Sequence, residues 1–290
     1  MRACRRGGGL CLCALHAYAL SSLLPLATRR APDPEVTHDL VNEGAPIEAA
    51  AELGPRYEHD PQLLALPLGL QIPTLRRCAP PLRRHASFWI AALYTDAYAD
   101  AAAALEASAA RLSLCFAAAR APPLPARRLL ALKPLFMLHT LRASPLPLVY
   151  MDADLQLAAF PRLFLPHAWP SPRDVLIFNW QANVSRGRRL KAASGVLFLN
   201  KSAPAEALLR AWAETMAHPN NSLSADDQAL DLLVNDGGWR HRLAWGWLPQ
   251  AYLRMPRFAR VEAVINHPGW PGRRRTGAAR PPVLPRERRA

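Results

Sequence analysis

Short apolar runs alternate with amphipathic segments between about residues 86 and 270. The runs are rich in aromatic and aliphatic residues and predict buried strands at 88–95, 112–118, 146–151, 174–180 and 195–200, with short late strands at 243–248 and 261–265. The intervening segments predict helices at 96–112, 126–141, 204–217 and 224–233. Pro134 should kink the second helix or mark its first turn. Strands alternating with helices predict an α/β domain with a mostly parallel sheet flanked by helices.

One of the predicted strands ends in acids. Residues 146–151 form an apolar run, and Asp152 and Asp154 follow it with a single alanine between them. Open α/β sheets bind their ligands at the carboxyl ends of strands. Two carboxylates so close repel each other unless a cation or strong donors neutralise them, and a hard divalent ion is the natural partner. The alternative is a solvated turn that contains two aspartates without any such role.

The composition fits a folded domain with basic ends. The chain has 290 residues, 51% of them apolar, which supports a sizeable core. Its net charge of +14 comes almost entirely from arginine, and much of it lies near the two ends. No helix-turn-helix, zinc-knuckle or aromatic RNA-binding signature accompanies this charge, so we expect no nucleic-acid partner.

The first 30 residues have the order of a targeting segment. Three arginines within residues 2–6 precede an almost uncharged stretch at 7–26, and Arg29 and Arg30 follow it. This order is typical of a signal peptide or of a membrane-spanning signal anchor. We therefore expect a protein of the secretory pathway, a type II membrane protein of the Golgi lumen. A secreted or an organelle-targeted protein is the alternative.

Composition also sets the remaining boundaries. Residues 31–85 are rich in proline and predict a stem or an irregular lead-in, with an amino-terminal subdomain as the alternative. A single domain is expected at 86–272. The basic, proline-containing segment at 273–290 predicts a disordered tail.

Cysteine and asparagine positions bear on the compartment. Cys78 and Cys115 form either one disulfide, in an oxidising compartment, or two buried free thiols. Three N-glycosylation triplets, at Asn183, Asn200 and Asn220, fit a lumenal domain. Such triplets also arise by chance, so they add little to the targeting segment.

A series of short motifs follows the order found in a known family. It begins with Lys133-Pro134 on a predicted helix and continues with the strand that ends in Asp152 and Asp154. The rest of the series is 194–200, 208–212, Asp227-Gln228 and 264–267. This order resembles the nucleotide-diphospho-sugar transferases, which are glycosyltransferases of the GT-A fold. The resemblance covers about residues 86–270 and implies a Rossmann-like sheet in a single catalytic domain.

The resemblance implies a metal site. Asp154 would bind a divalent ion, manganese or else magnesium, and Asp152 would bind it through water or hold the donor's ribose. His267 would be the third ligand, and an imidazole suits manganese better than magnesium. The ion would bridge the two phosphates of the donor, a nucleotide-diphospho-sugar, and stabilise the charge on the leaving nucleoside diphosphate. Otherwise His267 is an ordinary satisfied side chain.

The resemblance also implies donor-binding residues. Tyr94 and Thr95, at the end of the first strand, lie where the family receives the nucleotide base. Lys133 would reach the diphosphate, or else it is a surface charge. The simplest interpretation of Ser194 and Gly195 is a tight turn into a strand. The alternative is that their backbone lies close to the donor's sugar.

Asp227 is the strongest candidate for contact with the acceptor or the sugar hydroxyls, with Gln228 beside it. The alternative for Asp227, shared by Asp226, is an ordinary first-turn acid favoured by the helix dipole. The acceptor would be a glycan, a protein or a small molecule.

The predicted function is metal-dependent transfer of a sugar from a nucleotide-diphospho-sugar to an acceptor hydroxyl. Two rivals use the same residues differently. A phosphatase of the haloacid dehalogenase type also ends a strand in two aspartates, although it places them early in its domain and follows them with a hydroxyl residue. A catalytically inactive lumenal protein with the same fold would instead bind polyanions through its arginines.

Overall fold

The computed structural model describes residues 61–75, 78, 86–179, 191–218, 225–235, 238–255 and 261–268. The expected targeting segment, most of the lead-in, the basic tail and the triplets at Asn183 and Asn220 lie outside these residues. No helix within the described residues combines the length and the apolar content that crossing a bilayer requires.

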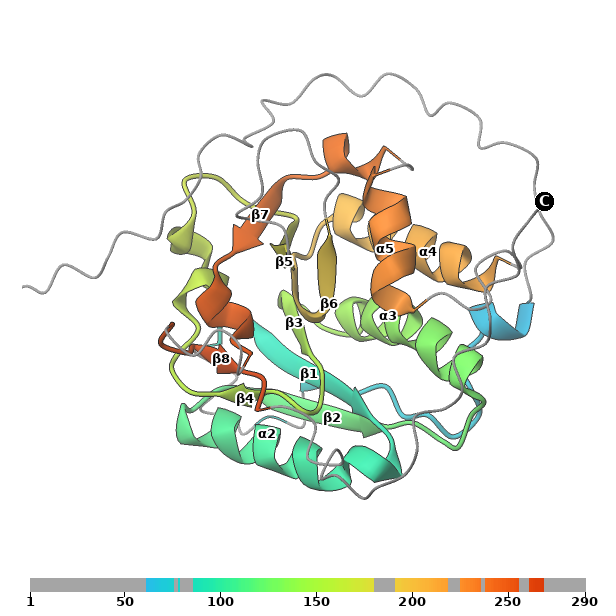
Figure 1. Cartoon of the computed structure of the whole chain (residues 1–290), viewed down its shortest axis with the longest axis horizontal. Helices are drawn as coiled ribbons and strands as arrows, with labels where there is room; N and C mark the ends of the chain where they lie inside the picture. Colours follow the sequence, from blue (N-terminus) through green and yellow to red (C-terminus); the bar gives the residue numbers. More distant parts are fainter. Residues whose placement is uncertain are drawn as a thin grey trace, which may run out of the picture. The chain divides into compact units, whose positions relative to one another are not determined.

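A central sheet joins segments from the whole domain. Its strands are β1 (Trp89–Tyr94), β2 (Phe116–Arg120), β3 (Leu148–Met151), β5 (Val175–Asn179), β6 (Ala192–Leu199) and β7 (Trp245–Leu248). Within the described residues, these six strands lie in the order β2-β1-β3-β6-β5-β7 (Figure 1). Strand β6 is antiparallel to both of its neighbours, and the other strand pairs are parallel. The predicted α/β fold with a mostly parallel sheet is confirmed.

The helices begin close to where the sequence predicts them, as α2 (Ala99–Arg111), α3 (Ala126–Arg142), α4 (Ala203–Ala217) and α5 (Asp226–Asn235). Asp96 starts a short 3-10 turn, η4 (Asp96–Tyr98), ahead of α2. Pro134 lies inside α3, which begins at Ala126, so placing Pro134 in the first turn is wrong. Proline has no N–H to donate, but residues 131–138 are all buried, and their packing stabilises the helix around it.

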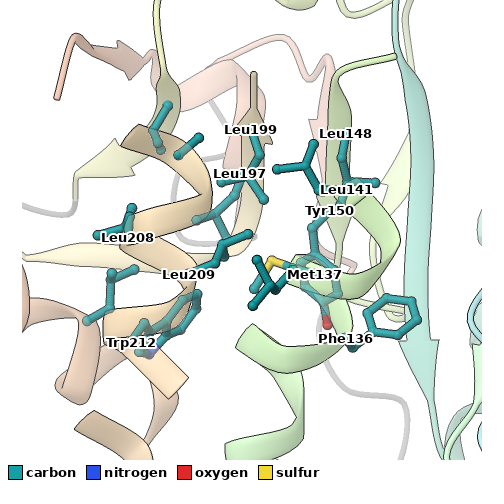
Figure 2. Packing of buried hydrophobic residues seen from close by; sticks show 14 of the residues in the cluster. Phe136, Met137, Leu141, Leu148, Tyr150, Leu197, Leu199, Leu208, Leu209 and Trp212 are labelled. Carbon is teal, nitrogen blue, oxygen red and sulfur yellow. The ribbon is translucent and has the colours of Figure 1, made fainter. Parts of the chain in front are cut away.

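Alternation along the strands divides the core into two faces. On β1, Trp89 and Ala91 face the side that α3, α4 and α5 cover, whereas Ile90 and Ala92 face the side of α2 (Figure 1). Figure 2 shows the first face, where side chains of α3 and α4 meet those of β3 and β6: Phe136, Met137, Leu141, Leu148, Tyr150, Leu197, Leu199, Leu208, Leu209 and Trp212.

The described part of the lead-in packs against this domain. It contains the 3-10 turn η2 (Pro61–Leu64), whose Leu63 is buried in the core between α3 and α4. Leu70 and Ile72 pack against the same core. A disulfide joins Cys78 to Cys115, just before β2, so the structure selects the disulfide over two free thiols.

A second, small sheet lies beyond the acids. It pairs β4 (Gln156–Leu157) with β8 (Ile265–Asn266) in antiparallel register. The pairing places Gln156 opposite Asn266, so the end of the domain returns to the segment that directly follows Asp154. A strand at 156–157 was not expected, because two residues are too few to carry an alternating pattern.

Candidate active site

The site is built where β3 ends and β6 begins. Because β6 is antiparallel, its first residues lie beside the last residues of β3: Met151 pairs with Val196. The backbone N–H of Asp152 donates to the carbonyl of Gly195 at 2.9 Å. Ser194 and Gly195 therefore lie inside a strand, and the expected tight turn is wrong. A Cβ on Gly195 would come within 3.0 Å of Asp152 Oδ2, so glycine leaves room for the carboxylate.

Asp152 turns toward α3. It continues the strand alternation that places Tyr150 on the α3 face, and the Tyr150 hydroxyl donates to Asp152 Oδ1 at 3.0 Å. The ammonium of Lys133 lies 2.9 Å from the same oxygen and 5.1 Å from the centre of the Tyr150 ring. Helical side chains point back toward the amino end of their helix, which in α3 follows the carboxyl end of β2. Lys133 is 8% exposed, so the surface-charge alternative is wrong.

A second acid completes this network from far along the chain. Asp226, the first residue of α5, places Oδ2 2.7 Å from Lys133 Nζ and accepts a hydrogen bond from Ser194 Oγ at 2.9 Å. Lys133 also donates to Ser194 Oγ at 3.1 Å. Trp212 on α4 donates from its indole nitrogen to the Asp226 carbonyl at 3.0 Å, which fixes the start of α5. Helices α3 and α5 and strands β3 and β6 thus meet at one ammonium group.

Asp226, and not Asp227, is the acid that Lys133 and Ser194 contact. Asp227 and Gln228 follow it in the first turn of α5, where Asp227 is partly exposed and Gln228 is exposed. Their expected role toward the acceptor stays a prediction. In the sequence, Asp226 is distinguished only as the first acid of a predicted helix.

The network keeps its members charged. Burial lowers the pKa of Lys133, but the carboxylates of Asp152 and Asp226 outweigh this effect and raise it well above the usual range. Burial alone would raise the pKa of Asp226. The charge of Lys133 and its hydrogen bond outweigh this effect, so the pKa of Asp226 lies below its usual value. Burial and the charge of Asp152 raise the pKa of Tyr150, which keeps its hydroxyl a donor.

Asp154 lies in a different environment, beside the small sheet. Because β4 and β8 are paired, His267 arrives next to Asp154, with His267 Nε2 3.6 Å from Asp154 Oδ2. The backbone N–H of His267 donates to the Arg254 carbonyl at 2.8 Å. Burial raises the pKa of Asp154; the His267 charge opposes this shift, and the neighbouring charge of Asp152 adds to it.

The residues around Asp154 suit a divalent cation. A carboxylate and an imidazole that face each other are a ligand pair that manganese accepts. Asp152 Oδ1 is already bound by Lys133 and Tyr150. Within the described residues, no group of three His, Cys, Asp or Glu side chains is arranged to hold a metal. The facing side chains of Asp154 and His267 are therefore the candidate pair for a cation among the described residues.

A cavity of about 520 Å³ lies at the carboxyl ends of β1 and β2. Tyr94 lines it, whereas Thr95 caps the start of η4 and its carbonyl accepts a hydrogen bond from the Tyr98 N–H at 2.8 Å. Tyr98, at the end of η4, has no role in the sequence analysis. Burial raises its pKa, and the charges of Asp154 and Asp152 raise it further, which places Tyr98 within the field of both acids.

Solved structures with a similar fold are glycosyltransferases. A glycosyltransferase involved in the glycosylation of the major capsid of PBCV-1 matches 63% of this chain and 93% of its own, at 11% identity and a TM-score of 0.47. The galactosyltransferase LgtC matches 63% of this chain and 87% of its own, at 12% identity and a TM-score of 0.40. Mouse xyloside xylosyltransferase 1 matches 63% of this chain and 97% of its own, at 13% identity and a TM-score of 0.39. No protein-family model and no curated protein matches the sequence.

These structures are described as glycosyltransferases, the class of protein that the order of the motifs resembles. The identities lie below 25% and the TM-scores below 0.5. The likeness therefore concerns the fold alone, and no statement about donor, acceptor or metal rests on it.

Proposed function

We propose that the chain is a metal-dependent glycosyltransferase that moves a sugar from a nucleotide-diphospho-sugar to an acceptor hydroxyl. One observation carries the proposal. Near the end of β3, Asp152 and Asp226 contact one buried lysine, Lys133, and Asp154 faces His267. Three acids therefore face one lysine and one histidine there, and a further cation would stabilise this local negative charge.

The two environments suggest separate roles for this chain's residues. Asp154 and His267 would hold a divalent ion, which when bound supplies positive charge to the diphosphate of the donor. Lys133 orients Asp152, whose Oδ2 is next to the glycine backbone of β6 and can accept a hydroxyl of the donor. Asp227 and Gln228 lie one and two residues after Asp226 along α5, and we assign them to contact with the acceptor.

The compartment is part of the proposal. A disulfide between Cys78 and Cys115 supports an oxidising location, such as the lumen of the secretory pathway. Asn200, one of the expected glycosylation sites, is partly exposed at the end of β6.

The test measures binding first and turnover second. Wild-type protein is titrated with MnCl2 together with ADP, GDP, CDP or UDP and followed by thermal shift, since a ligand of the folded state raises its melting temperature. Asp154→Asn should abolish the manganese-dependent shift. Asp100→Asn, which changes an exposed acid in the first turn of α2, is the matched control and should keep it.

Hydrolysis of nucleotide-sugars with manganese then tests the chemistry. Activity in the wild type that is lost in Asp154→Asn supports the proposal. Activity unaffected by Asp154→Asn contradicts it, and phosphate release from small phosphoesters points to the phosphatase rival.

A further inference from the structure

His267 is placed beside Asp154 by a very short strand. Strand β8 ends directly before His267, and it pairs with β4, which begins two residues after Asp154 (Figure 1). A pairing of two residues on each strand is marginal by itself. The position of the His267 imidazole therefore depends on what else holds β8.

Arg254 holds β8 along its other edge. It directly follows the 3-10 turn η9 (Gln250–Leu253) and forms a parallel bridge with Asn266. The N–H of Arg254 donates to the Ile265 carbonyl at 3.0 Å, and the N–H of His267 donates to the Arg254 carbonyl at 2.8 Å. Strand β8 is thus bonded on both edges, by β4 on one side and by Arg254 on the other.

The turn before Arg254 is a firm support. Tyr252 and Leu253 are buried in the core on the α2 face of the sheet. The Tyr252 hydroxyl accepts a hydrogen bond from the Leu163 N–H at 2.8 Å, and the Val264 N–H donates to the Ala251 carbonyl at 2.8 Å. Arg254 therefore joins β8 to a segment that is anchored in the core.

The Arg254 side chain adds a contact that these backbone bonds do not provide. Its Nη1 donates to Asn266 Oδ1 at 3.1 Å. Successive residues of a strand point to opposite faces, so the side chains of Asn266 and His267 lie on opposite sides of β8. The guanidinium therefore contacts β8 on the face away from Asp154, and its charge makes this hydrogen bond stronger than a neutral one.

We infer that Arg254 is a positioning residue for the proposed cation pair, and that its hydrogen bond to Asn266 fixes β8 so that the His267 imidazole faces Asp154. The inference rests on the proposed function, in which Asp154 and His267 hold a divalent ion. His267 Nε2 lies 3.6 Å from Asp154 Oδ2, so a small shift of β8 changes the space between the two ligands. Residues that orient a metal ligand contribute about 10–100-fold to metal affinity.

The charge of Arg254 makes the sign of the effect diagnostic. A guanidinium repels a nearby cation, so removal of its charge alone would strengthen manganese binding. Removal of a positioning contact would weaken manganese binding instead. A loss of affinity therefore identifies positioning and not electrostatics.

The experiment measures the dissociation constant of manganese by electron paramagnetic resonance, which detects the free ion, without nucleotide and with ADP, GDP, CDP or UDP. Arg254→Leu should weaken binding about tenfold, because the side-chain contact is lost while both backbone bonds remain. Arg254→Lys keeps the charge and a donor for Asn266, so it should recover part of the affinity. Asn266→Ala should weaken binding as much as Arg254→Leu, and the double variant should be no weaker than either.

Arg242→Leu is the matched control, since Arg242 is exposed beside Trp239 and its replacement removes the same charge. It should keep the wild-type dissociation constant. A second readout needs no metal: amide hydrogen exchange of residues 262–268 should be faster in Arg254→Leu than in the wild type and Arg242→Leu, because β8 is held less firmly.

The outcomes separate this inference from the proposed function. If the wild type binds no manganese under any of these conditions, the proposed function fails and this inference fails with it. If the wild type binds manganese and Arg254→Leu binds it equally or more tightly, only the inference is overturned. Additive losses in the double variant, no recovery in Arg254→Lys, or an equal loss in Arg242→Leu would also overturn it, because the effect would then not come from the contact with Asn266.

Discussion

Helix α3 forms a buried ion pair in its middle and an exposed one at its carboxyl end. The two pairs have similar contact distances but different environments. Lys133 lies 2.7 Å from Asp226, with side chains 10% and 15% exposed. Arg142 lies 2.8 Å from Glu206, with side chains 42% and 28% exposed. Burial, and not contact distance, therefore decides how much stability is lost when such an ion pair is broken.

The two regions differ in what replaces a lost partner. Water can solvate Glu206 once Arg142 is removed, so the Arg142–Glu206 pair contributes little to the free energy of folding. At Lys133 the partner Asp226 is largely buried, whereas the Asp152 side chain is 37% exposed, so a lost ammonium leaves one buried and one partly solvated acid without their counter-charge. The buried pair is therefore part of a site, and the exposed pair is a surface feature.

The largest effect is expected from Lys133→Met. The substitution keeps the aliphatic stem and removes the charge, and breaking a buried pair costs about 3–5 kcal/mol. The free energy of unfolding from urea titration measures it. Adding Asp226→Asn to Lys133→Met should recover part of the loss, because one of the two stranded carboxylates is removed. A cost no greater than that of Arg142→Met would remove the distinction between the two regions.

Ser194→Ala should have an intermediate effect. Ser194 is 6% exposed and donates to Asp226 Oδ2, so its loss leaves a buried acceptor with one partner fewer, at about 1–3 kcal/mol. Urea unfolding of Ser194→Ala, Asp226→Asn and the double variant gives the coupling energy. Additive effects of the two changes would mean that the hydrogen bond contributes nothing to the buried network.

The sequence predicted most of the sheet, because each central strand is a short apolar run buried on both faces. Residues 148–151, for example, are all buried, and the two acids follow directly. The buried middle of α3 was harder to interpret. Residues 131–138 have no exposed side. Lys133 could therefore be recognised as buried only through partners 19 and 93 positions away, Asp152 and Asp226.

The choice between Asp226 and Asp227 could not come from the sequence either. Successive helical residues point about 100° apart, and both acids lie in the first turn. The rotation of α5 is set by tertiary contacts such as the Trp212 hydrogen bond to the Asp226 carbonyl. Similarly, the Ser194-Gly195 pair looked like a turn, yet glycine is needed there for the close approach of Asp152 to a strand.

A smaller effect is expected at the other end of α3. Arg142→Ala should lower the free energy of unfolding by less than about 1 kcal/mol, because its pair with Glu206 is solvated. The cost should shrink as salt is added, since screening weakens an exposed pair. A double-mutant cycle with Glu206→Gln at low and high salt measures the coupling. A salt-independent coupling as large as that of Lys133 with Asp226 would contradict the comparison.

The smallest effect is a pH dependence that arises beside Arg142. Partial burial lowers the pKa of His139 below its usual value, and the charge of Arg142 lowers it further. The unfolded chain then binds the proton more readily than the folded one, so this contribution to stability is fully present above the ordinary histidine pKa, about 6.5, and is lost as the pH falls through the lowered folded value. His139→Gln should flatten the slope of unfolding free energy against pH there, and Arg142→Ala should reduce it in part. A slope that survives in His139→Gln would place the titration elsewhere in the molecule.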